Sequence, residues 1–555
     1  MNEAHRTGRL VIILHCHLPY VLGEGIWPHG ESWLFEAAAE TYLPLLMACD
    51  RLAEEGIRPG FTIEISPVLG EQLDDPRFRD GFPGFLDTLR DAASLDARTF
   101  GGEGRQEMVG LARAWEEHFG WLAQGFADRD GDLLGGFARL AEAGEIELAT
   151  CARTHGLLPM LGSPERVWRQ VAGGAAWFEA RFGRRPRGIW MPECAYRPGG
   201  SWDPVASGPA PEQHRPGNEE FLEEAGFGWT VVDTHLVAGG DPLGSYPARE
   251  ARLGEQRSPY RLYAIGRSSV VAFPRDPATT LQVWSGEWGY PGNPWYLEFH
   301  KKHSQGGLRY WRVSDPETPL EEKRVYEPDR VSGVISEQAD HFAELVAGVM
   351  AGARKAGIDS PVVTAPYDAE LFGHWWAEGV RWLEEARRAL HSRGVNVRTA
   401  DEAALEVGPA DQLALPAGSW GDGGDFRVWD NEQTGWIWQE IYRAERLLER
   451  TWDELPEDPP AELEAVVRQL ERSVLLIESS DWPFLITTQG APDYAAERVR
   501  RHSEAATRLS LIARQLSAGG RVPEELAGLV EDLESREPLW VATERRPGPP
   551  APTHR

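Results

Sequence analysis

The chain has 555 residues, of which 41% are hydrophobic and 26% are charged, the composition of an ordinary folded globular protein. This length exceeds what one hydrophobic core usually supports, so two or three domains are expected. With 57 basic and 87 acidic residues the net charge is −30, which argues against nucleic acid or an anionic membrane as a partner and suits a neutral ligand better.

Four cysteines in so long a chain predict free thiols and a reducing compartment. They are Cys16, Cys49, Cys151 and Cys194. The apolar stretch at residues 10–21 is too short to span a bilayer and lacks a cleavage-site pattern, so it is interpreted as a buried strand. A cytoplasmic location is therefore the default expectation.

Seven short apolar runs are predicted to be strands, and most are continuous rather than alternating, as in parallel strands covered on both faces. Helical patterns separate several of them, for example at 33–55 and 164–182. This alternation predicts an α/β fold with a parallel sheet, and seven strands suit an incomplete (β/α)7 barrel. The runs lie at residues 10–15, 61–66, 146–151, 188–191, 229–233, 269–273 and 361–365.

Two further regions are predicted to be helical and to lie outside the barrel. Residues 81–145 contain helix-like stretches and delay the third strand, so a small helical insertion is expected there. After about residue 405 the strands stop, and three helical patterns predict a helical C-terminal domain over 405–540. The catalytic barrel is thus assigned to 8–80 and 146–404, and the Pro-rich end at 541–555 is predicted to be disordered.

Polar residues follow most of the predicted strands, where the carboxyl ends of barrel strands would bring them to one face. A single such residue is most often a cap or a loop group, but so many strand ends together favour a functional site. These residues are His15, His17, Thr154, His155, Glu193, Asp233, Arg275, Asp276 and Asp368.

Glu193 and Asp368 stand out because aromatic and proline residues surround them in GIWMPECAY and APYDAELFGHWW. Burying a carboxylate in such surroundings is costly unless its ionisation is used. Two carboxylates at two strand ends are the arrangement that glycosidic-bond chemistry needs. The 23 tryptophans fit the same chemistry, because many stand in loop-like segments where exposed rings offer flat platforms for sugar faces.

Five of these elements, in chain order, resemble the motifs of glycoside hydrolase family 57 and, within it, of 1,4-α-glucan branching enzymes. The resemblance extends from residue 10 to about 520. It implies a (β/α)7 barrel with a helical insertion and a helical C-terminal domain. The elements are HCHLPY (15–20), ARTHGLLP (152–159), GIWMPECAY (188–196), APYDAELFGHWW (365–376) and SSDWPF (479–484).

By this resemblance Glu193 is the nucleophile and Asp368 the general acid/base of a retaining double displacement, with the two carboxyl groups about 5–5.5 Å apart. Glu370 is a rival for the acid role, since it lies two residues further on. An acceptor 6-hydroxyl would give an α-1,6 branch, as in glycogen biosynthesis, and water would give hydrolysis. The expected ligand is therefore an α-glucan, with no cofactor and no metal. The oligomeric state stays open between a monomer and a small homo-oligomer.

Other residues are expected to contact the glucan or to support the carboxylates. The histidines could hydrogen-bond sugar hydroxyls or the nucleophile, Arg275 could hold Glu193 ionised, and Asp481 could accept from a hydroxyl pair. Tyr246 is the candidate for a tyrosine at the tip of the loop after the fifth strand, as branching members have. The substrate-binding set is His15, His17, His155, Arg275, Trp284, Trp288, Trp376, Trp420, Trp429, Asp481, Trp482 and Tyr246.

Three other readings of the chain stay open at this point. An α-amylase-like hydrolase would use the same two carboxylates. A metal-dependent hydrolase or deacetylase could be built on His15, His17, His155 and an aspartate, because a His-x-His pair on a strand points to one face. A catalytically inactive glucan-binding protein is the third.

Overall fold

The computed structural model describes residues 8–26, 29–202, 213–244, 257–286, 288–315, 317–522, 526 and 528–541. Seven parallel strands form its centre, and they are the seven that the apolar runs predict. Each is short and buried, as expected for a sheet covered on both faces. The strands are β1 (Arg9–Cys16), β2 (Thr62–Ile65), β3 (Glu147–Cys151), β4 (Gly188–Trp190), β7 (Trp229–Val232), β9 (Val271–Pro274) and β10 (Val362–Asp368).

The sheet curls into the predicted barrel. Its strand order is β10-β1-β2-β3-β4-β7-β9. The two end strands are joined by a parallel bridge between Arg275, directly after β9, and Thr364 of β10. The Asp276 amide donates to the Thr364 carbonyl at 2.8 Å, so only this narrow contact joins the two strands. At this point β8 (Tyr263–Ile265) pairs antiparallel with β9 and continues the sheet to β11 (Gln412–Leu413).

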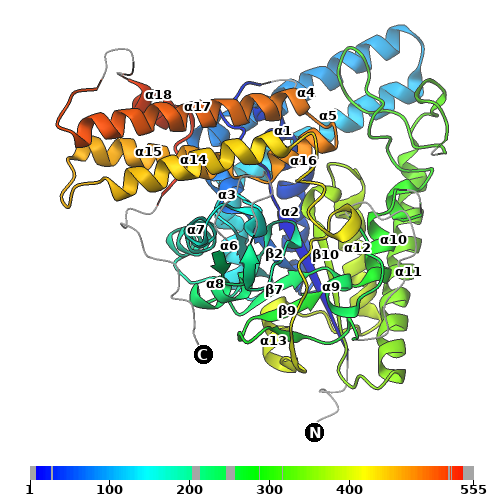
Figure 1. The fold of residues 1–555 in the computed structure, drawn as a ribbon. Coiled ribbons are helices and arrows are strands. Elements are labelled where there is room, and N and C mark those ends of the chain that lie inside the picture. The colour runs from blue at the N-terminus through cyan, green and yellow to red at the C-terminus, as the bar shows by residue number, and fades with distance from the viewer. Residues whose placement is uncertain are drawn as a thin grey trace.

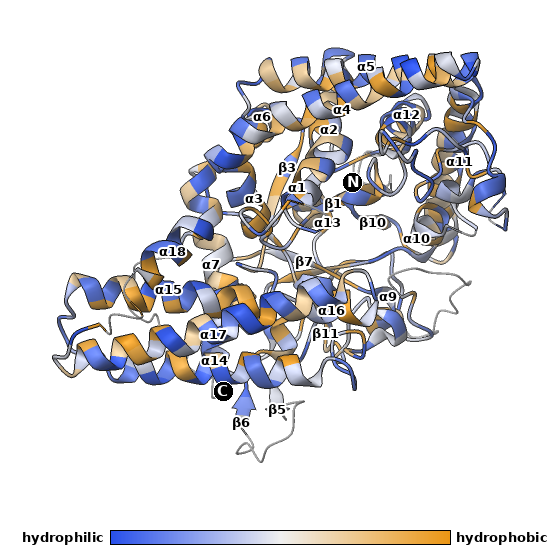
Figure 2. Cartoon of the chain, turned by 90° about the horizontal axis from the view of Figure 1, so that it is seen from above, coloured by the Kyte–Doolittle hydropathy of each residue, from blue (hydrophilic) through white to orange (hydrophobic). Residues whose placement is uncertain are grey.

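Helices cover the outside of the barrel, and Figure 2 shows apolar stripes on these helices against largely apolar strands. The first covering helix is interrupted by a π-helical turn, η2 (Ala38–Tyr42), between α1 (Glu31–Ala37) and α2 (Leu43–Glu54). The others are α3 (Pro67–Asp74), α7 (Pro164–Phe182), α8 (Asn218–Glu224), α9 (Thr234–Ala238), α10 (Pro277–Trp284), α11 (Pro328–Lys355), α12 (Gly379–Ser392) and α13 (Ala400–Val407).

Two groups of helices project from the barrel on different sides (Figure 1). The first is the hairpin of α4 (Pro76–Gly102) and α5 (Gln106–Ala127), followed by α6 (Leu133–Glu142). Helix α4 therefore begins before residue 81, where the insertion was predicted to start. The second group contains α14 (Gly435–Asp453), α15 (Ala461–Ile477), α16 (Asp481–Thr487), α17 (Pro492–Ser517) and α18 (Leu529–Arg536).

Some structured segments lie outside the seven predicted strands. Strands β5 (Gly200–Trp202) and β6 (Gln213–Arg215) form an antiparallel pair. The motif SSDWPF contains the start of the short helix α16. The predicted disordered end at 541–555 falls, except for residue 541, outside the described residues.

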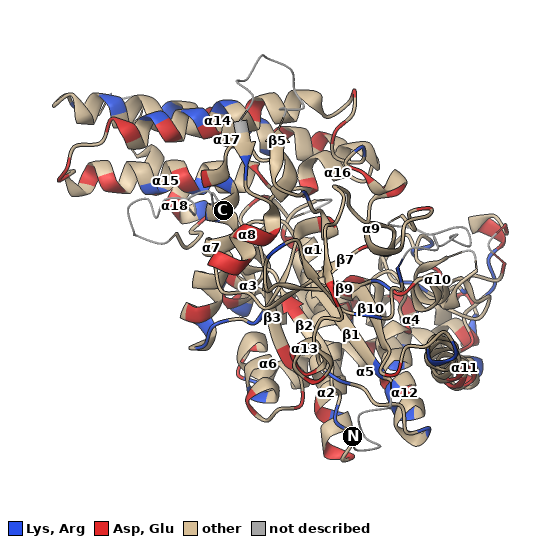
Figure 3. Cartoon of the chain, turned by 60° about the horizontal axis from the view of Figure 1, so that its bottom comes forward, with Lys and Arg blue, Asp and Glu red and all other residues tan. Residues whose placement is uncertain are grey.

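Figure 3 shows residues of both charges, mostly on helices and loops. The four cysteines are free and buried, which confirms the prediction of free thiols. Among the described residues, no helix has the length and apolar character needed to span a bilayer.

Candidate active site

A cavity of about 270 Å³ opens at the carboxyl ends of the barrel strands, and Glu193 and Asp368 both line it. The barrel supplies most of its wall, and Trp420 and α16 of the C-terminal region supply the rest. The convergence of strand-end residues expected from the sequence is thus found. Its lining consists of His15, His17, Leu18, Pro19, Trp33, Ala37, His155, Glu193, Trp284, Asp368, Glu370, His374, Trp375, Trp420, Asp481, Phe484 and Leu485.

Glu193 is placed by a strained turn directly after β4. Its backbone is left-handed, with φ 61° and ψ 22°, and Cys194 follows at φ 48°. Such conformations of residues other than glycine cost about 1–3 kcal/mol each and persist only where packing fixes them. Two donors hold the carboxylate: Trp420 Nε1–H at 2.9 Å to Oε2 and the Ser480 hydroxyl at 3.2 Å to Oε1.

Asp368 ends β10, opposite His15 in the strand register. Burial raises the pKa of both carboxyl groups to about 7, and the negative charges around them add to the rise. Their surroundings differ in one respect: the two donors to Glu193 stabilise its ionised form. The described residues provide no side-chain or backbone donor to the Asp368 carboxyl. The two carboxyl groups therefore differ in their hydrogen bonds, and those of Glu193 favour its carboxylate form.

Glu370 lines the same cavity but is engaged elsewhere. Its Oε1 accepts from the Tyr42 hydroxyl and from the His17 amide, the latter at 3.1 Å. Burial raises its pKa to about 7 as well. Because these bonds tie Glu370 to η2 and to the segment after β1, it is better placed to hold that segment than to protonate a sugar.

A chain of hydrogen bonds leads from the barrel interior to Glu193. Glu64 contacts His15 Nδ1, His15 Nε2 lies 3.2 Å from His155 Nε2, and His155 Nδ1 lies 2.8 Å from the Ser480 hydroxyl. Burial lowers the pKa of both histidines and raises that of Glu64, so all three are neutral.

One direction of donation satisfies this chain. Ser480 donates to the Glu193 carboxylate, so it accepts from His155, which accepts from His15, which accepts from protonated Glu64. The tautomers follow from these partners. Every link thus presents a donor toward Glu193, which favours its ionised form.

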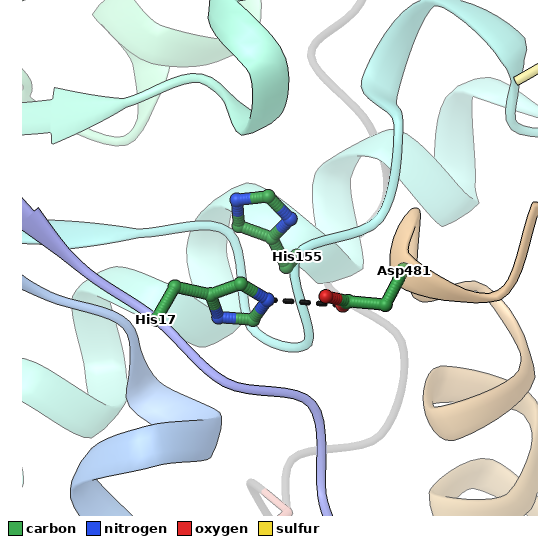
Figure 4. A group of neighbouring side chains, drawn as sticks. All are labelled: His17, His155 and Asp481. Atoms are coloured by element: carbon green, nitrogen blue, oxygen red, sulfur yellow. Dashed lines mark hydrogen bonds and ion pairs between the residues drawn. The ribbon is translucent and has the colours of Figure 1, made fainter. Parts of the chain in front are cut away.

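His17 lies beside Asp481 in the cavity (Figure 4). Burial alone would lower the pKa of His17, but the charge of Asp481 and a 2.9 Å hydrogen bond from Nε2 to that carboxylate raise it. Nδ1 lies 2.8 Å from the Ser66 hydroxyl. His17 in turn lowers the pKa of Glu193, the effect expected of Arg275 from the sequence.

Comparison with known proteins supports this chemistry. The description "Glycosyl hydrolase family 57" matches residues 11–416, well over half of the chain. The chain belongs to glycosyl hydrolase family 57. A second description, "1,4-alpha-glucan branching enzyme, C-terminal", matches residues 440–544 of this family 57 protein.

The similar proteins include branching enzymes. A 1,4-alpha-glucan branching enzyme of Thermococcus kodakarensis is 39% identical over 539 residues, covering 96% of this chain and 77% of the relative. The crystal structure of a branching enzyme from Pyrococcus horikoshii has a TM-score of 0.88 at 34% identity, and covers 98% of each chain. The α-amylase AmyC of Thermotoga maritima has a TM-score of 0.77 at 29% identity, covering 96% of this chain and 97% of its own.

His17, His155 and Asp481 of this family 57 site lie close enough to hold a metal ion, with one ligand atom of each within 4.8 Å of the others. The ring nitrogens of both histidines already have protein partners. The donor set therefore fits an ion pair and a hydrogen-bond chain better than a metal centre.

Arg275 does not contact Glu193. Its side chain is fully buried and pairs with Asp233 at 3.2 Å, while its guanidinium lies 5.2 Å from the Trp420 ring centroid. Arg275 therefore pairs with Asp233 rather than with Glu193, and an effect of its charge on Glu193 stays a prediction. Trp420, beside the Arg275 guanidinium, donates to Glu193.

Three predicted stacking platforms are interior residues, because their rings pack in the core and line neither this cavity nor its rim. These are Trp376, Trp429 and Trp482, exposed by 2%, 0% and 0%. Trp288 is exposed but lies outside the cavity lining. Trp284 and Trp420 do line the cavity. Tyr246 lies outside the described residues.

The structure adds cavity residues that the sequence reading missed. Trp375 lines the cavity where its neighbour Trp376 was expected, and Phe484 and Leu485 line it where Trp482 was expected. Glu64 had a visible signal, since it is a charged residue inside the apolar run FTIEIS. Ser480 had no comparable signal.

Replacing Glu370 by Gln is expected to move the basic limb of the activity profile to lower pH. Burial is the main reason that the pKa of Asp368 is high, and the charge of Glu370 raises it further. Removing that charge lowers the pKa of Asp368, so the acid loses its proton at lower pH. The measurement is kcat/KM on amylose across pH, with Glu385→Gln on α12 as the control. An unmoved limb, or one moved to higher pH, contradicts the assignment of Asp368 as the acid.

Proposed function

We propose that this chain is a 1,4-α-glucan branching enzyme that works by a retaining double displacement. The observation that carries the proposal is the pairing, in one cavity, of a carboxylate with two hydrogen-bond donors and a carboxylic acid without any. Branching enzymes among its relatives, which match nearly the whole chain, support the choice of reaction.

In the first step Glu193 attacks the anomeric carbon of an α-1,4-linked glucose unit. Asp368 gives its proton to the departing glycosidic oxygen, so the reducing-end part of the chain leaves and a glucosyl ester forms on Glu193. Loss of its proton makes Asp368 a base. Glu193 loses its negative charge as the ester forms. Trp420 and Ser480 stay in place, so they can donate to the carboxylate again when the second step releases it.

In the second step Asp368 removes the proton from the 6-hydroxyl of an acceptor glucan, whose oxygen attacks the anomeric carbon of the glucosyl ester and breaks its bond to the Glu193 oxygen. The new bond is α-1,6, Glu193 is released as a carboxylate, and Asp368 regains its proton. Branching requires the acceptor hydroxyl to react with the glucosyl ester faster than water does. The apolar side chains of Trp284, Trp375, Phe484 and Leu485 restrict the access of water to the ester.

The proposal gives each region of the chain a role. The barrel, 8–80 and 146–404, carries both carboxylates, and the C-terminal region, 405–540, contributes Trp420, Ser480 and Asp481. The helical insertion, 81–145, lies outside the catalytic cavity. The substrate is a linear or branched α-glucan such as amylose, amylopectin or glycogen, and the buried free thiols support a cytoplasmic location.

The similarity to AmyC makes an α-glucan hydrolase the second candidate. Incubation with amylose separates the two activities. Branching lowers the iodine colour without a matching rise in reducing ends and creates linkages that a debranching enzyme cuts. Reducing ends that rise in step with the loss of colour would establish hydrolysis instead.

A further inference from the structure

A second cavity, larger than the catalytic one at about 450 Å³, lies between the α4–α5 hairpin, the α1–α2 segment and α12. The catalytic mechanism uses none of its residues. Its lining consists of Glu36, Ala39, Glu40, Pro44, Arg51, Phe85, Leu89, Trp115, His118, Phe119, Trp121, Lys302, Gly307, Leu308, Arg309, Gly373, Ala377, Val380, Arg381 and Glu384.

One wall of this cavity is a row of aromatic rings on α5. Trp115, His118 and Trp121 are three residues apart, so they lie on one side of the helix over about 9 Å. Trp121 is 41% exposed, unusual for so large an apolar side chain, and the Arg51 guanidinium lies 5.7 Å from its ring centroid. Rings presented in this way offer flat apolar surfaces with polar edges.

Polar groups in fixed positions lie beside these rings. Arg51 bonds Glu384 through two nitrogens, at 2.7 and 3.1 Å, and Arg309 bonds Glu40 at 2.6 Å. The lining holds three carboxylates and four cations, so the charges nearly balance. Paired ions beside aromatic rings suit a neutral ligand with many hydroxyl groups better than a strongly charged one.

Part of the cavity wall is a hairpin around residues 302–309, which packs against helix α4 of the insertion. Lys302 pairs with Arg309 across this hairpin, and its neighbours His303 and Tyr310 donate to the fully buried Asp96 of α4 at 2.7 and 2.9 Å. A Cβ on Gly306 would lie 2.2 Å from an Asp96 oxygen, so the hairpin tip packs tightly against α4. The cavity is therefore built into the fold.

The two cavities share a wall. Within the π-helical turn η2, Tyr42 donates to Glu370 of the catalytic cavity, whereas Glu40 faces the second one. Glu40 also accepts from His374, which lines the catalytic cavity. A glucan chain held in the second cavity is therefore separated from the catalytic cavity by the π-helical turn η2.

We propose that this second cavity is a non-catalytic α-glucan-binding site, in which a glucan stacks on the exposed Trp121 ring of α5 and bonds the paired ions beside it. The inference rests on the proposed function for its ligand. A glucan held here raises the local concentration of chains at the neighbouring active site, so occupancy lowers the KM for long glucans without changing kcat.

Glucan binding is measured by retardation in native gels containing amylopectin, with all variants in the Glu193→Gln background so that the ligand is not consumed. Trp121→Ala is expected to raise the apparent dissociation constant about 3- to 10-fold. Trp121→Phe, which keeps a ring, restores most of the retardation. The control is Trp540→Ala, a side chain 38% exposed at a different cavity.

In the active enzyme Trp121→Ala is expected to raise the KM for amylopectin, and to leave kcat and the KM for a short maltooligosaccharide unchanged. Equal retardation of Trp121→Ala and its parent, or an equal loss in Trp540→Ala, overturns the second site. A wild-type protein that binds amylopectin but forms no α-1,6 linkages overturns the proposed function instead, so the two failures are distinguishable.

Discussion

Glu193→Gln is expected to lower the turnover of amylose by at least about 10⁴-fold while leaving glucan binding intact. An amide has no charge to form the glucosyl ester. It is nearly the same size as the carboxylate, so it keeps its place between Trp420 and Ser480. The rate of α-1,6 linkage formation and the affinity for amylopectin are measured on the same preparation.

The matched control for this variant is Glu478→Gln, a buried carboxylate of the same type that pairs with Arg166 outside the cavity. Thermal unfolding shows whether either change acts through folding. Retained turnover in Glu193→Gln would refute Glu193 as the nucleophile. Loss of both turnover and binding, with a normal melting temperature, would assign it to substrate binding.

Asp368→Asn is expected to lower the turnover of amylose by about 10²–10⁴-fold, the usual contribution of a general acid/base. The loss should depend on the leaving group. A glucan oxygen needs a proton to depart, whereas the fluoride of an α-maltotriosyl fluoride departs without one, so the first step is largely restored with that substrate.

The second step then becomes slow, because no base activates the acceptor. A burst of fluoride followed by a slow steady rate is the expected time course. Equal loss with both substrates would show that Asp368 does not act as the acid, and would point to Glu370 as its replacement.

The seven barrel strands could be predicted because each is a continuous apolar run that ends in a polar group, the pattern of a parallel strand buried on both faces. The strands β5, β6, β8 and β11 carry no such pattern. They are two or three residues long, and pairing with a neighbour defines them rather than local composition.

The two carboxylates were visible in the sequence, but the identity of their neighbours was not. Trp375 and Trp376 are adjacent, and only the turn that follows β10 decides which ring faces the cavity. Arg275 follows β9 as predicted, and it pairs at 3.2 Å with Asp233, the residue directly after the neighbouring strand β7. Ser480 lies in the motif SSDWPF, yet its hydrogen bond to Glu193, 287 residues away in sequence, comes from tertiary packing that the motif does not indicate.

The central claim is that Glu193 forms a covalent glucosyl ester in a retaining reaction. Asp368→Asn incubated with α-maltotriosyl fluoride accumulates that ester, because its second step is slow. Mass spectrometry of the digested protein tests it directly. A maltotriosyl group on the peptide that contains Glu193 is the predicted result, and an unlabelled Glu193 peptide during turnover, or a label on another carboxylate, would contradict it.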